Sequence, residues 1–97
     1  MQADLKILIL EDSEEDLYLV ERELQRGGMA YSSVVVKKKD QYVLALNEFK
    51  PDVILSDHSL PQFNSIEAMK IWKEHQKANN LTIPFILITG SVSEEFA

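Results

Sequence analysis

The sequence predicts an α/β fold in which helices cover a parallel sheet. Two observations carry this prediction. Short apolar segments of strand length alternate with longer segments of helical periodicity, and the apolar segments are nearly continuous rather than alternating with polar residues. Continuous runs are typical of parallel strands buried on both faces, and strand–helix alternation implies right-handed crossovers. The 97 residues make one domain, which we assign to residues 1–97.

The first half of the chain predicts two strands, Leu5 to Leu10 and Tyr31 to Val36, each followed by a helix. Ser13 is a good N-cap for the first helix, because acids follow it in the first turn, and Gly27-Gly28 stops that helix. Asp40 is the expected cap of the second helix. The side chains expected to face the sheet are Leu17, Val20 and Leu24, then Val43, Leu46 and either Phe49 or Tyr42.

The second half predicts a buried strand that ends at Asp57, a helix that begins near Asn64 or Ser65, and a strand from Ile83 to Ile88. Asn79-Asn80 ends the third helix. The residues expected to point inward from that helix are Ile66, Met69 and Trp72. The last expected features are a turn at Leu60-Pro61, a turn at Thr89-Gly90-Ser91 and a capped helix opening at Ser93.

Composition excludes several classes of protein. The net charge of −6 argues against a nucleic-acid-binding surface, and the only basic run, Lys37-Lys38-Lys39, is short enough to be a solvated strand end. The absence of cysteine excludes disulfides and thiolate-bound metals. No apolar stretch is long enough to span a membrane, and no signal-peptide pattern opens the chain. We therefore expect a cytoplasmic location, with no membrane or nucleic-acid partner.

Three acids follow the ends of predicted strands. Glu11 and Asp12 come directly after the first strand, and Asp57 ends the third. These two strands are neighbours in a doubly wound sheet, so the carboxylates meet at one edge and repel one another unless a cation neutralises them. Mg²⁺ suits such oxygen ligands, and Thr89 adds a hydroxyl at the same edge. This combination favours phosphoryl chemistry, with a carboxylate as the nucleophile.

The chain resembles the receiver domains of bacterial response regulators, and in particular receivers found in or beside sensor histidine kinases. The matching residues are Ile7 to Asp12, Pro51 to Asp57, Leu60-Pro61 and Pro84 to Gly90. The resemblance covers the whole chain and implies a flavodoxin-like, doubly wound parallel sheet with strand order 2-1-3-4.

The same resemblance implies a role for each site residue. Asp57 is the phosphoacceptor, which takes a phosphoryl group from a histidine kinase or a histidine phosphotransfer protein and also touches Mg²⁺. Asp12 binds Mg²⁺ directly and Glu11 binds it through water, while Ser59 lends its backbone carbonyl. Thr89 bonds the phosphoryl oxygen and acts as a switch. Phosphorylation and dephosphorylation are then self-catalysed, so the domain is not an enzyme in the usual sense.

The sequence departs from the family in two places. Asn64-Ser65 stands where Asp-Gly is common, which strains Ser65 if its backbone needs a positive φ. The family's fifth strand, with its aromatic residue and its lysine, and its fifth helix do not follow within the 97 residues. We therefore expect the chain to be incomplete at its C-terminal end, with the fourth strand left as an apolar edge.

Two other functions compete with phosphoacceptance. One is an interaction module of the same fold that needs no phosphate, which the missing lysine would permit. The other is a flavodoxin-like nucleotide or flavin carrier, which the acidic segment Glu11 to Asp16 disfavours because it would repel a bare phosphate. We expect neither histidine to be a site residue. His58 is expected to be an exposed neighbour of Asp57, and His75 to lie on a solvated helix face. Dimerisation is left open.

Overall fold

The computed structural model describes residues 4–11, 13–28, 30–57 and 65–88. Four parallel strands form one sheet in the order β2-β1-β3-β4, as the sequence predicts. The elements are β1 (Leu5–Leu10), α1 (Glu14–Arg26), β2 (Tyr31–Val36), α2 (Lys39–Glu48), β3 (Val53–Asp57), α3 (Ser65–Asn79) and β4 (Phe85–Ile88). None of the helices in these ranges combines the length and the apolar character that crossing a membrane requires.

β1 is the centre of the sheet. It pairs with β2 on one side and with β3 on the other, so that Leu10 stands between Val36 and Ser56. The four residues from Ile7 to Leu10 are at most 1% exposed. Helices cover both faces of this strand, which explains why its sequence is a continuous apolar run.

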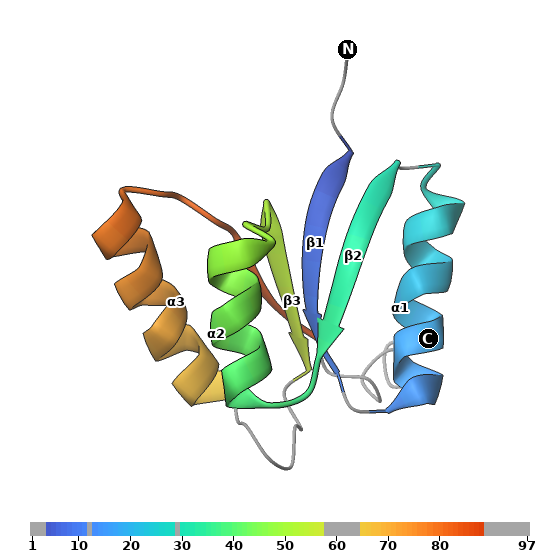
Figure 1. Cartoon of the computed structure of the whole chain (residues 1–97). Helices are drawn as coiled ribbons and strands as arrows, with labels where there is room; N and C mark the ends of the chain where they lie inside the picture. Colours follow the sequence, from blue (N-terminus) through green and yellow to red (C-terminus); the bar gives the residue numbers. More distant parts are fainter. Residues whose placement is uncertain (1–3, 12, 29, 58–64, 89–97) are drawn as a thin grey trace.

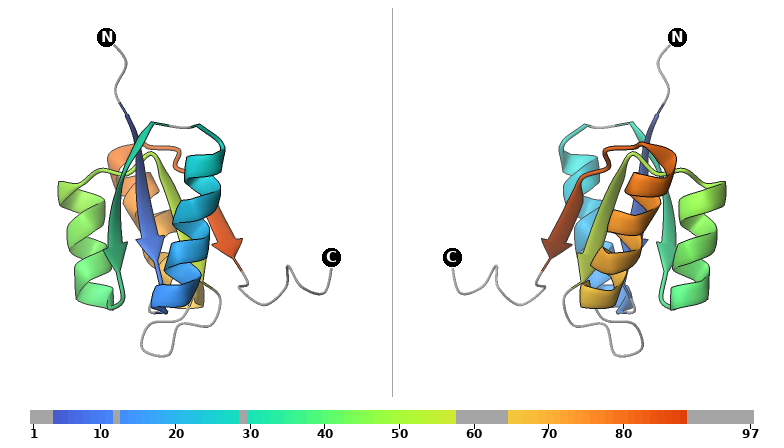
Figure 2. Two further views of the ribbon diagram at one scale, coloured as in Figure 1. Left: turned by 90° about the vertical axis from the view of Figure 1, so that its right-hand side faces the viewer. Right: turned by 90° about the vertical axis from the view of Figure 1, so that its left-hand side faces the viewer.

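The sheet is covered unequally on its two faces (Figures 1 and 2). α2 and α3 pack on one face, where Leu8, Leu10 and Ile54 form a core with buried side chains of both helices. α1 covers the other face with half-buried residues and contributes none that is fully buried. Ile86 of β4, which pairs with Leu55 and alternates with the core residue Phe85, is 48% exposed on the α1 face.

α1 begins and ends where the sequence predicts. The hydroxyl of Ser13 accepts a 3.3 Å hydrogen bond from the backbone N–H of Asp16. This N–H lies in the first turn, where backbone donors have no partner within the helix. Gly27 keeps a right-handed backbone, and Gly28 follows with φ of 68°. The predicted inward face is confirmed, since Leu17, Val20 and Leu24 are all half-buried.

α2 differs from the prediction at its start and in its rotation. The N-cap is Lys38 rather than Asp40, which lies inside the first turn. Val43 was expected to face the sheet, but it is 37% exposed, whereas Tyr42 and Leu46 are buried. The buried hydroxyl of Tyr42 donates to the carbonyl of Ala68 on α3, and this partner sets which face of α2 points inward.

α3 begins at Ser65 and ends at Asn79, as predicted, but its inward face is not the predicted one throughout. Ile66 is 70% exposed and Ala68 is fully buried, because Ala68 is the residue that packs against α2. Met69 is half-buried, and Trp72 packs against the core.

β4 begins at Phe85, two residues later than predicted. The backbone of Ile83 is engaged by α3 instead, because its carbonyl accepts a 2.6 Å hydrogen bond from Trp72 Nε1 and its N–H donates to the side chain of Gln76. The predicted turns at Leu60-Pro61 and Thr89-Gly90-Ser91 and the helix opening at Ser93 lie outside the described residues.

Candidate functional site

The carboxyl ends of the four strands form one edge of the sheet, and the three described helices begin there (Figure 1). Leu10 pairs with Ser56, so Glu11 and Asp57 each come one residue beyond this pair on neighbouring strands. Asp57 pairs in turn with Ile88, the residue before Thr89 in the sequence. The register therefore brings the ends of β1, β3 and β4 level at this edge, as the sequence predicts.

Glu11 is a buried acid at this edge. Its residue is 4% exposed, its N–H donates a 3.1 Å hydrogen bond to the carbonyl of Val36, and its Oε1 accepts a 3.0 Å bond from the N–H of Ser13. A carboxylate is costly to bury without such partners, and the N-terminus of α1 carries partial positive charge. The start of α1 thus holds a carboxylate at the end of the central strand.

The remaining predicted site residues are only partly described. Asp12, Ser59 and Thr89 lie outside the described residues, and Asp57 is described by its backbone at the end of β3. Among the side chains that the structure does describe, no group of three or more acids or histidines is placed to hold a metal ion. Of the four predicted magnesium ligands, Glu11 is the only one whose side chain the structure describes. Its buried carboxylate oxygens are suitable ligands for a hard divalent ion.

The sequence analysis did not identify the hydrogen bonds that hold the connection between β2 and α2 at the same edge. Gln41 Oε1 accepts hydrogen bonds from the N–H groups of Lys37 at 2.9 Å and of Lys38 at 3.3 Å. The sequence signal was a Gln three residues after the N-cap, which is the spacing of a capping box. The lysine run itself is exposed, as predicted.

An ion pair also links the first turns of two helices near this edge. Lys39 Nζ of α2 lies 3.1 Å from Glu67 Oε2 of α3, and both side chains are substantially exposed. An exposed pair of this kind stabilises a fold by about 0–1 kcal/mol, so its contribution to the stability of this domain is small.

The chain is similar in sequence to proteins of two-component signalling. It is 29% identical over 91 residues to the alkaline phosphatase synthesis transcriptional regulatory protein PhoP of Bacillus subtilis. This match covers 94% of this chain and 35% of the relative. It is 29% identical over 84 residues to the DNA-binding transcriptional regulator NtrC of Proteus hauseri, covering 87% and 16%. Hybrid signal transduction histidine kinase D of Dictyostelium discoideum is 28% identical over 93 residues, covering 92% and 6%.

The chain thus spans about a third or less of the curated relatives that it matches. No protein-family model matches it. Among solved structures, it superposes on the receiver domain of the sensor histidine kinase PA1611 from Pseudomonas aeruginosa with a TM-score of 0.71 and 25% identity, over 90% of this chain and 68% of the other. In its fold, and at 25% identity in its sequence, the chain resembles this receiver domain.

A second solved structure supports the fold alone. The N-terminal domain of a response regulator receiver protein from Methanoculleus marisnigri matches with a TM-score of 0.61 and 20% identity, over 94% of this chain and 89% of the other. The PA1611 receiver domain holds a magnesium ion in its active site cleft. Ligands of open α/β sheets bind at the carboxyl ends of the parallel strands, the edge that Glu11 and Asp57 occupy in this chain.

Proposed function

We propose that this chain is a receiver domain and that it accepts a phosphoryl group on Asp57 from a phosphohistidine of a histidine kinase or a histidine phosphotransfer protein. The observation that carries the proposal is the register of β1 and β3, in which Glu11 and Asp57 follow the paired residues Leu10 and Ser56. The backbone of Asp57 thus ends β3 beside the strand that the buried acid Glu11 follows.

The proposed magnesium site consists of the carboxylates of Glu11, Asp12 and Asp57 and the backbone carbonyl of Ser59. When bound, Mg²⁺ neutralises these acids and the charge on the transferring phosphoryl oxygens. The magnesium ion of the PA1611 receiver domain supports this proposal, as does the buried carboxylate of Glu11. The N–H of Ser13 donates to Glu11 Oε1 and so helps to orient this carboxylate.

The chemical step is a transfer between two nucleophiles. A carboxylate oxygen of Asp57 forms a bond to phosphorus as the bond between phosphorus and the histidine nitrogen breaks, and the imidazole keeps the electron pair of that bond and is protonated. Thr89 donates its hydroxyl to a phosphoryl oxygen. Water later attacks the acyl phosphate and restores Asp57, so the domain both gains and loses the phosphoryl group.

Intact-mass measurement tests the proposal directly. The chain is incubated with acetyl phosphate, with Mg²⁺ or with EDTA, and its mass is compared with that of the untreated chain. We expect an increase by one phosphoryl group that requires Mg²⁺ and is absent in Asp57→Asn. Asp4→Asn is the matched control, because Asp4 is an exposed acid that precedes β1 and so lies at the opposite edge of the sheet from the strand ends.

The outcome also decides against the alternative functions. No adduct on a folded chain, from acetyl phosphate or from a phosphorylated histidine kinase, would favour an interaction module that acts without phosphate. An adduct that persists in Asp57→Asn would place the acceptor elsewhere. A bound nucleotide or flavin in the purified protein would favour the carrier function.

A further inference from the structure

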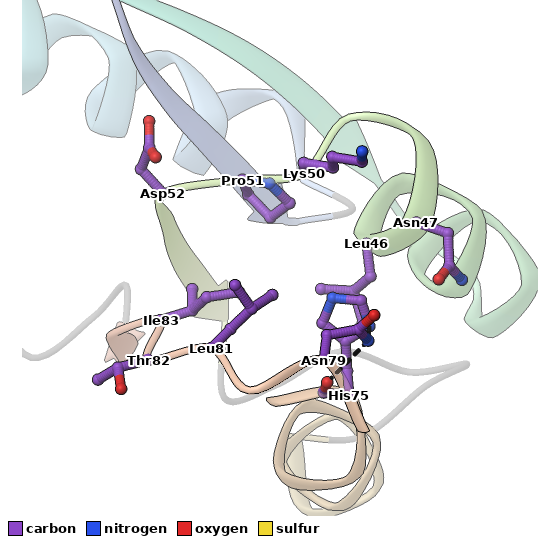
Figure 3. Close-up of a pocket in the computed structure, with 10 residues that line it drawn as sticks. All are labelled: Leu46, Asn47, Lys50, Pro51, Asp52, His75, Asn79, Leu81, Thr82 and Ile83. Atoms are coloured by element: carbon purple, nitrogen blue, oxygen red, sulfur yellow. Dashed lines mark hydrogen bonds between the residues drawn. The ribbon is translucent and has the colours of Figure 1, made fainter. Parts of the chain in front are cut away.

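A pocket of about 400 Å³ lies at the edge of the sheet opposite to Asp57 (Figure 3). It is enclosed by the last turns of α2 and α3 and by the segments that lead into β3 and β4. Pockets that bind small molecules have volumes of about 300–1,000 Å³. This pocket is large enough for a small ligand, and the proposed phosphoacceptor site does not use it.

The interior of the pocket is apolar. Leu46 and Ile83 belong to the hydrophobic core and are 1% and 5% exposed, and Pro51 is also buried. Leu81 is 46% exposed and lies across the opening from His75 (Figure 3). Leu81 therefore offers an apolar ligand body an exposed surface, above a floor of buried side chains.

Several polar side chains of the rim are already engaged in hydrogen bonds within the domain. The amide groups of Asn47 and Asn79 donate 2.9 Å hydrogen bonds to the carbonyls of Val43 and His75 within their own helices. Asp52 accepts from the N–H of Lys6, and its carboxylate points away from the opening (Figure 3). Within the described residues, the ammonium group of Lys50 has no ion pair or hydrogen bond, so it is the one lining cation available to a ligand.

Lys50 also occupies an unfavourable backbone position. Each of the three described helices is followed by a residue of positive φ: Gly28 at 68°, Asn80 at 54° and Lys50 at 55°. Glycine and asparagine are the usual residues at such positions, whereas the β-carbon of a lysine is strained there. The N–H of Lys50 caps the carbonyl of Ala45 at 3.2 Å, a bond that glycine would make equally well. The backbone therefore gives no reason for a lysine at this position.

We propose that this pocket binds a small organic carboxylate. The apolar body of the ligand packs on Leu81, over the buried floor that Leu46 and Ile83 form, and its carboxylate pairs with the ammonium group of Lys50. The carbonyl ends of α2 and α3 carry about half a negative charge each and oppose an anion. One carbonyl at each end is capped, by Lys50 at Ala45 and by Leu81 at Gln76. The full charge of Lys50 outweighs the partial charges of the others when it is in direct contact with the ligand.

Titration with benzoate tests this site on the 97-residue chain, with ¹⁵N chemical shifts as the readout. We expect saturable shifts confined to the pocket residues, with an affinity in the millimolar range that suits so small a ligand. Benzamide, which has the same ring without the charge, should bind about tenfold more weakly. Acetate, which has the charge without the ring, should also bind more weakly than benzoate.

Variants of Lys50 separate ligand binding from a role at the helix end. Lys50→Met, which keeps the bulk and loses the charge, should weaken benzoate about tenfold, whereas Lys50→Arg should retain it. Lys70→Met is the matched control, because Lys70 is an exposed lysine of α3 that does not line the pocket. Equal binding by Lys50→Met and the wild type would overturn the proposal and leave Lys50 as a cation at the carbonyl end of α2. Absence of saturable shifts in the wild type would overturn it without any variant.

Discussion

The hydroxyl of Tyr42 donates a 2.9 Å hydrogen bond to the backbone carbonyl of Ala68, and neither residue is exposed. This bond joins α2 to α3 inside the core, between residues that are 26 positions apart in the sequence. A buried hydroxyl without a partner is costly, so the bond fixes the rotation of α2 against α3. Val43, the next residue, consequently turns towards solvent.

Removal of this hydroxyl should destabilise the domain without changing its fold. Tyr42→Phe keeps the ring in the core and deletes the donor, and we expect a loss of about 1–2 kcal/mol in the free energy of unfolding. Denaturation in urea measures this loss. Tyr18→Phe is the control, because Tyr18 is 64% exposed and its change should lie within about 0.5 kcal/mol. Equal stability of Tyr42→Phe and the wild type would mean that packing alone orients α2.

Tyr42 should also make the stability of the domain depend on pH in the alkaline range. Burial raises the pKa of the Tyr42 phenol above its ordinary value of 10.0. The unfolded chain therefore loses this proton at lower pH than the folded chain does, so its contribution to stability is complete below about pH 10 and declines above it. The stability difference between the wild type and Tyr42→Phe should shrink as the pH rises from neutral to about 11. A constant or growing difference would contradict this account.

The sheet was predictable from the sequence because its signal is local. The run Ile7 to Leu10 is apolar whichever helices cover it, and Ser13 caps α1 through a residue only three positions away. The rotation of α2 was not predictable, since Ala68 decides it from a distant part of the chain. The start of β4 was misplaced for the same reason, because Trp72 takes the carbonyl of Ile83.

The candidate site was predictable in part. The positions of Glu11 and Asp57 follow from strand ends and sheet order, which are properties of the hydrophobic pattern. The role of Gln41 was not found, because the capping-box spacing counts from Lys38, whereas Asp40 was the expected N-cap. A side chain that serves the backbone gives a weaker signal than one that follows a helical or strand period.

Two adjacent glycines offer a matched test of backbone strain. Gly28→Ala should destabilise the domain by about 1 kcal/mol, because its φ of 68° strains a β-carbon even though no atom lies within 4 Å of it. Gly27 has a right-handed backbone, and a β-carbon there would meet the carbonyl of Leu24 at 3.5 Å, an ordinary contact. Gly27→Ala should therefore be neutral or stabilise by up to about 1 kcal/mol. Thermal denaturation of the two variants measures both effects, and the reverse order would exclude φ strain as the cause.

The proposed role of Glu11 predicts opposite effects with and without magnesium. Glu11→Gln keeps the shape of the side chain and an oxygen that can accept from Ser13, but it removes one carboxylate from the acidic edge. Without metal, we expect the variant to be at least as stable as the wild type, because fewer like charges repel. With Mg²⁺, the wild type should gain stability, and the variant should need about tenfold more metal for the same gain.

Thermal denaturation over a magnesium series, at constant ionic strength, separates these effects. Glu74→Gln is the control, because Glu74 is an exposed acid of α3. A variant that responds to Mg²⁺ as the wild type does would remove Glu11 from the proposed metal site.

The central position of β1 has a consequence for synthesis on the ribosome. β1 is made first, yet its partners are β2 and then β3, which is complete only at Asp57. The apolar residues Ile7 to Leu10 therefore leave the ribosome well before the strand that closes their second side. During that interval the nascent chain presents its most hydrophobic segment to chaperones and to other chains. The segment that is most completely protected in the folded domain is thus the one most exposed to misassembly while the domain is being made.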